Sequence, residues 1–473
     1  MRNIAWDDMA TGQRMVTDSD ILILGAGMTG LCAAHYAAQR FGQERVLVLE
    51  AADAPGGTAR TDHIDGFTIE WGPNGFLDKE PKTLGWMADL GLGEQLVRVN
   101  EAAAHRFIYR AGRLHEVKPP PAFLVSPLLS VRGRARLLCE PFVQGKRDDA
   151  PESVWEFAKR RIGREAADIL VSPMVSGIFG GDAKQLSLEH CFPRMAEMER
   201  TYGGLFKAMR ALRKSGASAM GPSGVLTSLR EGIGGVAQRV QTRLGGRLRL
   251  GVKVNSIQLS GSGGFRVETD TDGQDEAFEA RTVVVALPAY AASACCAALE
   301  ERLASALGKI AYAGIAVVSA AFRREQVGHD LNGFGFLVPR TEGRRLLGCL
   351  WDSTLFPNRA PEDCVLLRAM YGGYTDPDAV RLSDASLLDC LRREVYDLLR
   401  ISGEPELLRI YRHPLGIPQY LLGHEDCMRA VETAEQLFPG LVFAGNAYRG
   451  IGLNDCVLSA LRAVDRVERG IRL

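Results

Sequence analysis

A glycine-rich turn between a short apolar segment and a helix constrains this chain more than any other sequence feature. Residues 21–24 form an apolar run typical of a buried strand, and residues 31–40 have a helical pattern. Between them lies Gly-Ala-Gly-Met-Thr-Gly, and a second apolar run, residues 46–49, ends in Glu50. The order strand, glycine turn, helix, strand and acid predicts a βαβ unit that binds a dinucleotide.

Each glycine of this turn has its own expected role. Gly25 permits the tight turn, Gly27 lets the backbone approach a pyrophosphate, and Gly30 lets the helix pack against the sheet. The N-terminus of the helix favours bound phosphate. Glu50, about 20 residues after Gly30, is expected to accept hydrogen bonds from the ribose hydroxyls. The glycine motif alone would also suit a purely structural turn, but the strands and the acid favour a dinucleotide.

Two further glycine turns favour FAD over NAD. Gly56 and Gly57 open a second loop, close to the first in sequence, that an NAD domain does not need. Near the other end of the chain, residues 441–444 resemble a buried strand, residues 445–455 a glycine-rich turn and residues 457–467 a helix. The N–H groups and dipole of such a turn suit the electron-rich edge of a reduced flavin. We therefore expect FAD, with NAD as the alternative.

Composition argues against several other classes of protein. The length of 473 residues predicts two or three substructures. The 57 basic and 57 acidic residues balance, which gives no support for a nucleic-acid partner. The ten cysteines form no C-x-x-C motif, so no metal site is expected. No apolar run is long enough for a signal peptide or a membrane span, and a cytoplasmic protein is expected.

The motifs taken in order resemble the protoporphyrinogen oxidase family, within the amine-oxidase-like flavoproteins. The resemblance extends from residue 20 to residue 473. It is carried by Gly25 to Gly30, Glu50, Gly56-Gly57 and residues 72–76, 232–235, 333–339, 417–424 and 445–456. Thr58 is a departure, because many members of the wider group have arginine there.

The resemblance implies an α/β, two-dinucleotide-binding-domain flavoprotein. It would have a Rossmann-like FAD domain, a mixed α+β substrate domain and a helical, membrane-associating subdomain. The expected boundaries are 1–19 for a flexible N-terminal segment, 20–104 with 222–292 and 412–473 for the discontinuous FAD-binding domain, 105–221 for the helical subdomain and 293–411 for the substrate-binding domain.

The same resemblance implies which residues contact non-covalently bound FAD. Residues 71–74 are expected along the flavin, residues 451–453 at its pyrimidine end, and the backbone of Val254 beside the adenine. From the residues alone, 251–257 has the alternation of an ordinary strand. The full expected set is Gly25, Ala26, Gly27, Met28, Thr29, Gly30, Glu50, Ala51, Gly57, Thr58, Trp71, Gly72, Pro73, Asn74, Val254, Gly445, Ile451, Gly452 and Leu453.

A porphyrinogen is a large apolar macrocycle with carboxylates at its edge, so its site needs apolar walls and at least one cation. The resemblance implies that Arg106 binds a propionate and that the backbone of Gly177 contacts a pyrrole ring. It also implies that Leu337, Leu350 and Met370 form apolar walls. Without the resemblance, Arg106 would be interpreted as a surface residue and the three apolar residues as ordinary core.

No side chain is expected to act as a catalytic acid, base or nucleophile, because flavin N5 can accept a hydride. The implied reaction is the oxidation of protoporphyrinogen IX to protoporphyrin IX, with oxygen reoxidising the flavin and giving hydrogen peroxide. The alternatives are oxidation of coproporphyrinogen III to coproporphyrin III, another amine-oxidase-like flavoprotein, and a flavin-binding protein without turnover.

The stretch from His105 to Arg147 contains nine basic and only two acidic residues, and it includes the apolar residues 119–125. Cations beside apolar side chains suit an anionic membrane surface, and a solvated basic face is the alternative. The resemblance favours peripheral association with the inner face of the cell membrane. Whether the chain forms a homodimer is left open.

Overall fold

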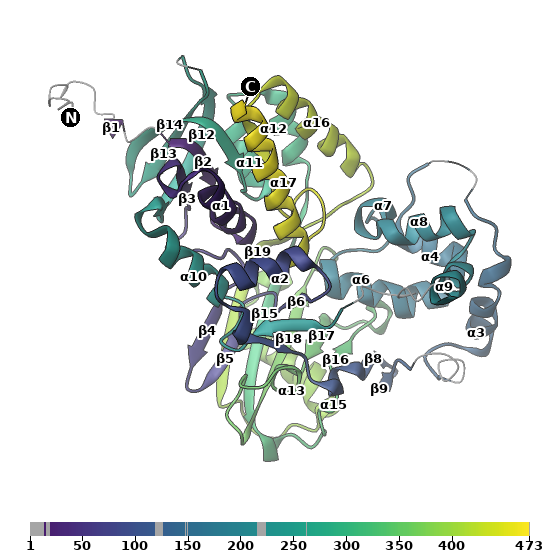
Figure 1. Cartoon of the computed structure of the whole chain (residues 1–473). Coiled ribbons are helices and arrows are strands. Elements are labelled where there is room, and N and C mark those ends of the chain that lie inside the picture. Colours follow the sequence, from purple (N-terminus) through teal and green to yellow (C-terminus); the bar gives the residue numbers. More distant parts are fainter. Residues whose placement is uncertain are drawn as a thin grey trace.

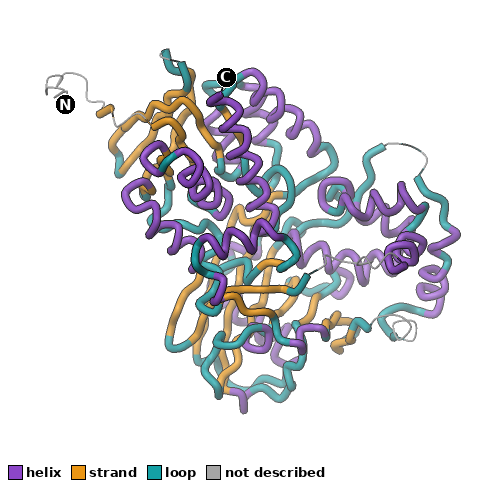
Figure 2. The backbone as a smooth tube through the Cα atoms, in the orientation of Figure 1, coloured by secondary structure: helices purple, strands orange, loops and turns teal. Residues whose placement is uncertain are grey.

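The computed structural model describes residues 14–15, 19–118, 126–146, 148, 150–214, 224–261 and 263–472. Two large sheets and a group of helices make up this part of the chain (Figure 1). Figure 2 shows strands gathered in two regions and helices dominating a third. The expected apolar run 119–125, Arg147 and most of the N-terminal segment 1–19 lie outside the described residues.

The first sheet has eight strands and contains the βαβ unit predicted from the glycine turn. Its order is β11-β3-β2-β14-β13-β12, and both β1 and β20 also pair with β14. The strands around the turn are parallel, whereas β12, β13 and β14 pair antiparallel. The strand bounds are β1 Arg14–Met15, β2 Ser19–Leu24, β3 Val46–Leu49, β11 Leu248–Arg249, β12 Val252–Leu259, β13 Phe265–Thr271, β14 Gln274–Val285 and β20 Leu441–Phe443.

Helices cover both faces of this sheet, which explains why its central strands are apolar throughout. One face packs against α1, α10 and α17, and the other against α11, α12 and α16. The predicted strands and helices around the first glycine turn and around residues 441–467 are therefore present. The helix bounds are α1 Met28–Phe41, α10 Gly235–Leu244, α11 Ala289–Cys296, α12 Glu301–Gly308, α16 His424–Leu437 and α17 Leu453–Arg472.

The second sheet has seven strands in the order β19-β15-β18-β17-β16-β8-β9. Its bounds are β8 Arg106–Arg110, β9 Arg113–Glu116, β15 Tyr312–Arg323, β16 Gly335–Leu337, β17 Leu346–Leu350, β18 Cys364–Gly372 and β19 Leu407–Pro418. One face packs against α14 (Asp384–Leu391), which continues as a π-helical turn and α15 (Asp397–Leu399). The hairpin of β4 (Thr61–Ile64) and β5 (Phe67–Glu70) packs on the other face.

Two expected boundaries differ from this arrangement. Strands β8 and β9 fall in the segment 105–221 assigned to the helical subdomain, but they belong to the seven-stranded sheet, because β8 pairs in parallel with β16. Strand β19 crosses the expected boundary at residue 412 and pairs with β15 along its length. In both cases the backbone N–H and C=O groups find their partners in a distant segment, which local patterns do not reveal.

A small three-stranded sheet joins the two large ones. It has the order β6-β10-β7, formed by Phe76–Leu77, Leu226–Leu229 and Leu96–Arg98. Helix α2 (Pro81–Asp89) follows β6 and packs with Trp86 and Met87 into the core beneath α1. Arg359, which is 2% exposed, forms an ion pair with the equally buried Glu70 at 3.1 Å and donates to Ser228 of β10. This ion pair ties β5 to the small sheet.

The helical group lies to one side of both sheets (Figure 2). Its members are α3 Val131–Leu138, α4 Val154–Ile162, α5 Arg164–Ala166, the π-helical turn Ala167–Val171, α6 Ser172–Phe179, α7 Leu188–Cys191, α8 Pro193–Tyr202 and α9 Leu205–Lys214. The fully buried Arg161 pairs with Glu140 and Glu199. Glu140 also accepts from the backbone N–H of Leu205 and Phe206. A buried charge network thus joins α4, α8 and α9.

The described residues contain neither a membrane-spanning helix nor a cluster of metal-ligating side chains. None of the described helices is both long enough and apolar enough to cross a bilayer. In the same part of the chain, no group of three or more histidine, cysteine, aspartate or glutamate side chains is arranged to hold a metal ion.

Candidate cofactor and substrate site

The first glycine turn combines a closed side and an open side. Gly25 has a φ of +97°, and a Cβ there would lie 2.8 Å from the carbonyl oxygen of Ala286. A Cβ on Gly30 would overlap the carbonyl oxygen of Gly25. In contrast, no described atom lies within 4 Å of the position that a Cβ on Gly27 would take. The outer two glycines are therefore required by the fold, whereas Gly27 leaves an open surface at the start of α1.

The second glycine loop packs directly on the first. The N–H of Gly56 donates to the carbonyl of Ala26 at 2.8 Å, and Gly27 and Gly56 form an isolated β-bridge. The Cβ position of Gly57 lies 3.5 Å from the Cα of Gly27. Gly57 and Thr58 are exposed beside this contact. The two loops, about 30 residues apart in sequence, therefore form one edge, as a pyrophosphate-binding turn that serves a larger dinucleotide requires.

Glu50 lies at the end of β3 and is oriented by two backbone groups. Its Oε2 accepts from the N–H of Ala26 at 2.7 Å, and its Oε1 accepts from the N–H of Ala52 at 2.9 Å. A carboxylate oxygen has two lone pairs, so each oxygen can still accept a ribose hydroxyl. Ala51, the residue between these contacts, is exposed. The arrangement fits the expected ribose contact and shows that Glu50 also supports the glycine turn.

Val254 lies near this strand end, although it belongs to another part of the sequence. The backbone N–H of Val252 donates to the carbonyl of Glu50 at 2.9 Å, so β12 starts beside the acid. A register irregularity follows between Val254 and Ser256. The thiol of Cys295 lies 3.4 Å from the carbonyl oxygen of Val254. Val254 therefore lies two residues along β12 from the contact with Glu50, which is compatible with the adenine contact that the resemblance implies.

The segment 71–74 is held by two side chains from the seven-stranded sheet. His413 Nε2 donates to the carbonyl of Trp71 at 2.8 Å, and Arg368 Nη1 donates to the carbonyl of Gly72 at 2.6 Å. Burial lowers the pKa of His413, so the imidazole stays a neutral donor. Arg368 is 2% exposed, and its Nε lies 3.0 Å from Asp352 Oδ2. These contacts fix the direction of the segment that is expected to face the flavin.

Two buried N–H groups of this segment fit a bound cofactor. The side-chain amide nitrogen of Asn74 and the indole nitrogen of Trp71 are buried without a hydrogen-bond partner among the described residues. Buried polar groups in proteins nearly always have a partner. The heteroatoms of an isoalloxazine ring system are acceptors of the required kind. Trp71 also stacks on Tyr411, with ring centroids 4.9 Å apart, which keeps the segment rigid.

The C-terminal turn is supported from several directions. The N–H of Gly445 donates to Ser459 Oγ at 3.0 Å, and Tyr420 Oη donates to the carbonyl of Asn446 at 2.5 Å. The N–H of Gly452 donates to Asp455 Oδ2 at 3.0 Å, which caps the start of α17. Ile451 is half-buried and Leu453 is buried. The turn presents the positive end of a 20-residue helix, as expected for contact with the flavin pyrimidine.

A single row of paired residues crosses the seven-stranded sheet from the cofactor side to Arg106. Arg368 on β18 is in register with Leu350 on β17, Leu350 with Gly335 on β16, and Gly335 with Arg106 on β8. With strands about 4.8 Å apart, the row spans about 14 Å between its end residues. At one end of the row, Arg368 donates to the carbonyl of Gly72, and at the other end lies the guanidinium of Arg106.

The apolar residues expected on the substrate side lie on the same face as this row. Phe336, Cys349 and Ala369 face the core under α14, so their strand neighbours Leu337, Leu350 and Met370 face the opposite side. Gly177 of α6 lies against them, because a Cβ at this glycine would come within 2.8 Å of Leu337 Cδ2. The structure therefore brings all five expected substrate residues to one face.

Arg106 is exposed at the edge of this face. Its guanidinium lies over the ring of Phe334, 5.2 Å from the centroid. No carboxylate in the described part of the chain forms an ion pair with it. A cation oriented by an aromatic ring but without an acidic partner can receive a substrate carboxylate.

Sequence reasoning missed several residues of this region. Arg368 and His413 show no local motif, because their contacts with residues 71–72 join segments 296 and 342 residues apart. Asp352 contacts Arg368 and not residues 71–72, and it has no distinctive motif either. Met174 and Ile178 lie on α6 on either side of Gly177 and are 40% and 46% exposed. No sequence motif distinguished these two apolar residues.

Comparison with known proteins agrees with this geometry. Residues 28–468 match the family described as flavin containing amine oxidoreductase. The chain is therefore a flavin-dependent oxidoreductase with the amine-oxidase fold. The family's flavin and the cradle formed by the glycine turns together make FAD its cofactor.

The chain belongs to the flavin containing amine oxidoreductase family, and within it the resemblance to protoporphyrinogen oxidases is confirmed. It is 31% identical to the chloroplastic protoporphyrinogen oxidase of Nicotiana tabacum, over 95% of this chain and 85% of that protein. It is 28% identical to coproporphyrinogen III oxidase of Bacillus subtilis (strain 168), over 94% and 97%. A crystal structure of a proposed protoporphyrinogen oxidase from Exiguobacterium sp. 255-15 superposes with a TM-score of 0.82, at 26% identity, covering 97% of this chain and 100% of the other.

The open side of the first turn leads to a paired prediction. Gly27→Ala should leave the thermal stability of the apoprotein within about 0.5 kcal/mol of wild type, because a methyl group meets no protein atom there. It should weaken FAD binding about tenfold, or by about 1.4 kcal/mol. Gly30→Ala should destabilise the apoprotein by about 2–3 kcal/mol, because the methyl group overlaps backbone. Thermal unfolding and FAD titration of both variants check this. Equal effects of the two changes on the apoprotein would contradict it.

Proposed function

We propose that this chain oxidises protoporphyrinogen IX to protoporphyrin IX, with oxygen as the electron acceptor and hydrogen peroxide as its product. The observation that carries the proposal is the row from Arg368 to Arg106. A flexible porphyrinogen macrocycle lying over Leu350 and Met370 can place one edge at the cofactor segment and a propionate at Arg106. The names of relatives from tobacco, Arabidopsis thaliana and rice support the same substrate.

In this proposal the protein side chains bind and orient, and bound FAD supplies hydride acceptance. Arg106 binds a propionate, Gly177 contacts a pyrrole ring, and Leu337, Leu350 and Met370 exclude water from the macrocycle. His413 and Arg368 hold the segment 71–74 in place. No protein acid or base is assigned to the reaction.

The cofactor contacts expected from the sequence are proposed unchanged. Their support is the joint edge of the two glycine loops, the orientation of Glu50 and the capped start of α17. The discontinuous FAD domain, 20–104 with 222–292 and 412–473, is proposed with β19 assigned to the substrate sheet. Strands β8 and β9 likewise move from the helical subdomain to the substrate domain.

The substrate assignment predicts a specific pattern of flavin reduction. Mixed anaerobically with protoporphyrinogen IX, the purified protein should lose its oxidised flavin absorbance within one turnover. When the protein is mixed with a primary amine or a polyamine instead, the oxidised flavin absorbance should remain. Coproporphyrinogen III is the second candidate, because the Bacillus subtilis relative is named for it. The ratio of kcat/KM for the two porphyrinogens, measured on one preparation, decides between them. Reduction by amines alone would overturn the proposal.

Arg106 is predicted to bind one substrate propionate. Arg106→Ala should raise KM at least about tenfold, the cost of losing a charge-assisted hydrogen bond of roughly 1.5–3 kcal/mol. Arg106→Lys should recover part of the affinity, because it keeps the charge but not the paired hydrogen bonds. FAD content and melting temperature should stay at wild-type values, since Arg106 is exposed and lacks an acidic partner among the described residues. Normal KM in the alanine variant, or loss of FAD, would refute the assignment.

We also propose that the outer edge of the helical group contacts a membrane surface. Helix α3 lies at this edge (Figure 1). Val131 and Leu138, at its two ends, are 74% and 50% exposed, and Phe142 just after it is 86% exposed. Arg132 is exposed beside them. Large exposed apolar side chains next to cations suit an anionic lipid surface.

The membrane proposal predicts lipid-dependent sedimentation. Wild-type protein should sediment with vesicles that contain phosphatidylglycerol and less with pure phosphatidylcholine vesicles. Phe142→Ser should weaken binding by about tenfold or more, because burying one such side chain contributes about 1.5–3 kcal/mol. Leu259→Ser is the matched control, since Leu259 is 59% exposed on the distant strand β12. If both variants sediment like wild type, α3 does not bind lipid.

A further inference from the structure

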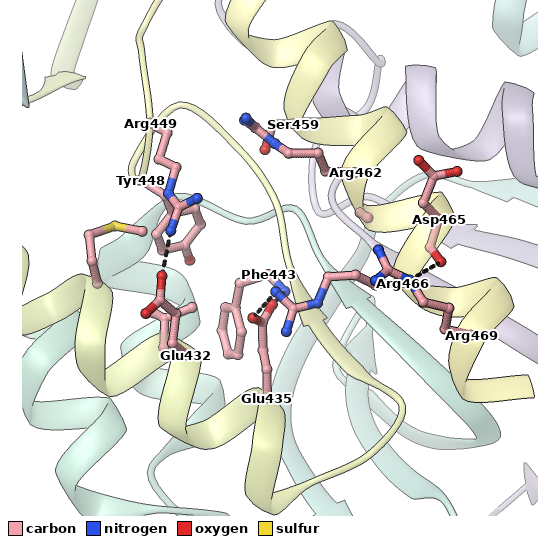
Figure 3. Close-up of a pocket in the computed structure, with 13 residues that line it drawn as sticks. Glu432, Glu435, Phe443, Tyr448, Arg449, Ser459, Arg462, Asp465, Arg466 and Arg469 are labelled. Carbon is pink, nitrogen blue, oxygen red and sulfur yellow. Dashed lines mark hydrogen bonds and ion pairs between the residues drawn. The ribbon is translucent and has the colours of Figure 1, made fainter. Parts of the chain in front are cut away.

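A cavity of about 350 Å³ lies between α16 and α17, away from the substrate face. Figure 3 shows its lining, to which α16 contributes side chains spaced three or four residues apart, as does α17. Phe443 at the end of β20 and Tyr448 in the following turn complete its floor. None of the lining residues belongs to the seven-stranded sheet that carries Arg106.

The charges around this cavity leave a cation in excess. Its lining contains four arginines and three carboxylates. Glu432 pairs with Arg449. Glu435 pairs with Arg466 at 2.6 Å and also accepts from the N–H of Phe443 at 2.8 Å. The third carboxylate, Asp465, pairs with Arg40 of α1 at 2.7 Å. Every carboxylate of the lining is therefore already engaged.

These pairs leave two of the four lining arginines over, Arg469 and the solvent-exposed Arg462. No described carboxylate forms an ion pair with Arg462, and in Figure 3 no dashed line reaches its side chain. Burial, and after it the nearby Arg449, lower the pKa of Arg462, whereas the carboxylate of Asp455 raises it. Arg469 lies farther along α17, and its Nε donates to the carbonyl of Asp465. The guanidinium of Arg462 can therefore receive an anion that enters the cavity.

Apart from Ser459, whose Oγ accepts from the N–H of Gly445, the rest of the lining is mainly apolar. Met428, Val431 and Ala463 line the cavity with the rings of Phe443 and Tyr448. An inorganic anion would pair with Arg462 but would make no contact with these apolar side chains. An organic acid would satisfy both, because a guanidinium binds a carboxylate through two parallel hydrogen bonds and apolar walls bind its body.

We propose that the cavity between α16 and α17 is a binding site for an organic carboxylate with an aromatic or alkyl body. Arg462 receives the carboxylate, with Arg449 adding to the positive potential. The apolar body lies against Phe443 and Tyr448. This site is independent of the proposed porphyrinogen site.

Calorimetric titration of the flavin-loaded protein tests this proposal. Benzoate and hexanoate should bind saturably at one site, whereas neutral benzamide should bind at least about tenfold more weakly at the same ionic strength. Inorganic phosphate should also bind more weakly than benzoate. Arg462→Gln should lower benzoate affinity at least about tenfold, and Arg462→Lys should restore part of it. Arg429→Gln is the matched control, because Arg429 is an exposed arginine of α16 outside the lining.

Four outcomes would overturn the proposal. They are the absence of saturable benzoate binding, equal binding of benzamide, equal binding of phosphate, and unchanged benzoate affinity in Arg462→Gln. A competition experiment distinguishes this site from the substrate face. Benzoate should not compete with porphyrinogen, and competitive inhibition would mean that benzoate binds at the substrate face instead. Melting temperatures of the variants should match wild type, because Arg462 has no carboxylate partner among the described residues to lose. If Arg462→Gln does not fold, Arg462→Lys should still bind benzoate more weakly than wild type, and unchanged affinity in that variant would overturn the proposal.

Discussion

The close contact between Gly30 and the carbonyl of Gly25 is the constraint on which the rest of this structure depends. It brings the start of α1 against the end of β2, and this position leaves the surface at Gly27 open. Glu50 and the second glycine loop both bond to the backbone of Ala26 in the same turn. Any side chain at Gly25 or Gly30 would displace all three groups together. The cofactor cradle is thus one packed unit, held by backbone contacts.

The seven-stranded sheet connects this cradle to the substrate face. Asp352 neutralises Arg368, and Nη1 of Arg368 donates to the carbonyl of Gly72. Arg368 is therefore a positioning residue, and its burial makes the position of the segment 71–74 depend on the sheet. Arg106 lies at the other end of the same row and stays exposed. The two arginines at the ends of this row therefore differ in role. Arg368 is paired inside the protein and positions the segment 71–74, whereas Arg106 is exposed and has no acidic partner among the described residues.

The sequence predicted those parts of the site whose contacts join residues close together in the chain, and missed those whose contacts join distant segments. The glycine turn, Glu50 and the helix after residue 452 depend on neighbours within about 25 residues, and the spacing of residue types identified them. Arg106 and Leu337 came only from the family resemblance, because an exposed arginine and a strand leucine have no distinctive local pattern. Arg368, His413 and Arg462 were not found, since their partners lie in segments that only the folded chain brings together.

The sequence by itself determined the βαβ unit, the choice of a flavin and the approximate places of strands and helices. These follow from hydrophobic periodicity and from glycine positions that no other residue can occupy. Only the tertiary structure decided that β8 joins β16, that β19 pairs with β15 beyond residue 412, and that Arg368 meets Gly72. The physical reason is that sheet register is set by pairing between distant strands, and a shift of one residue would turn every side chain to the other face.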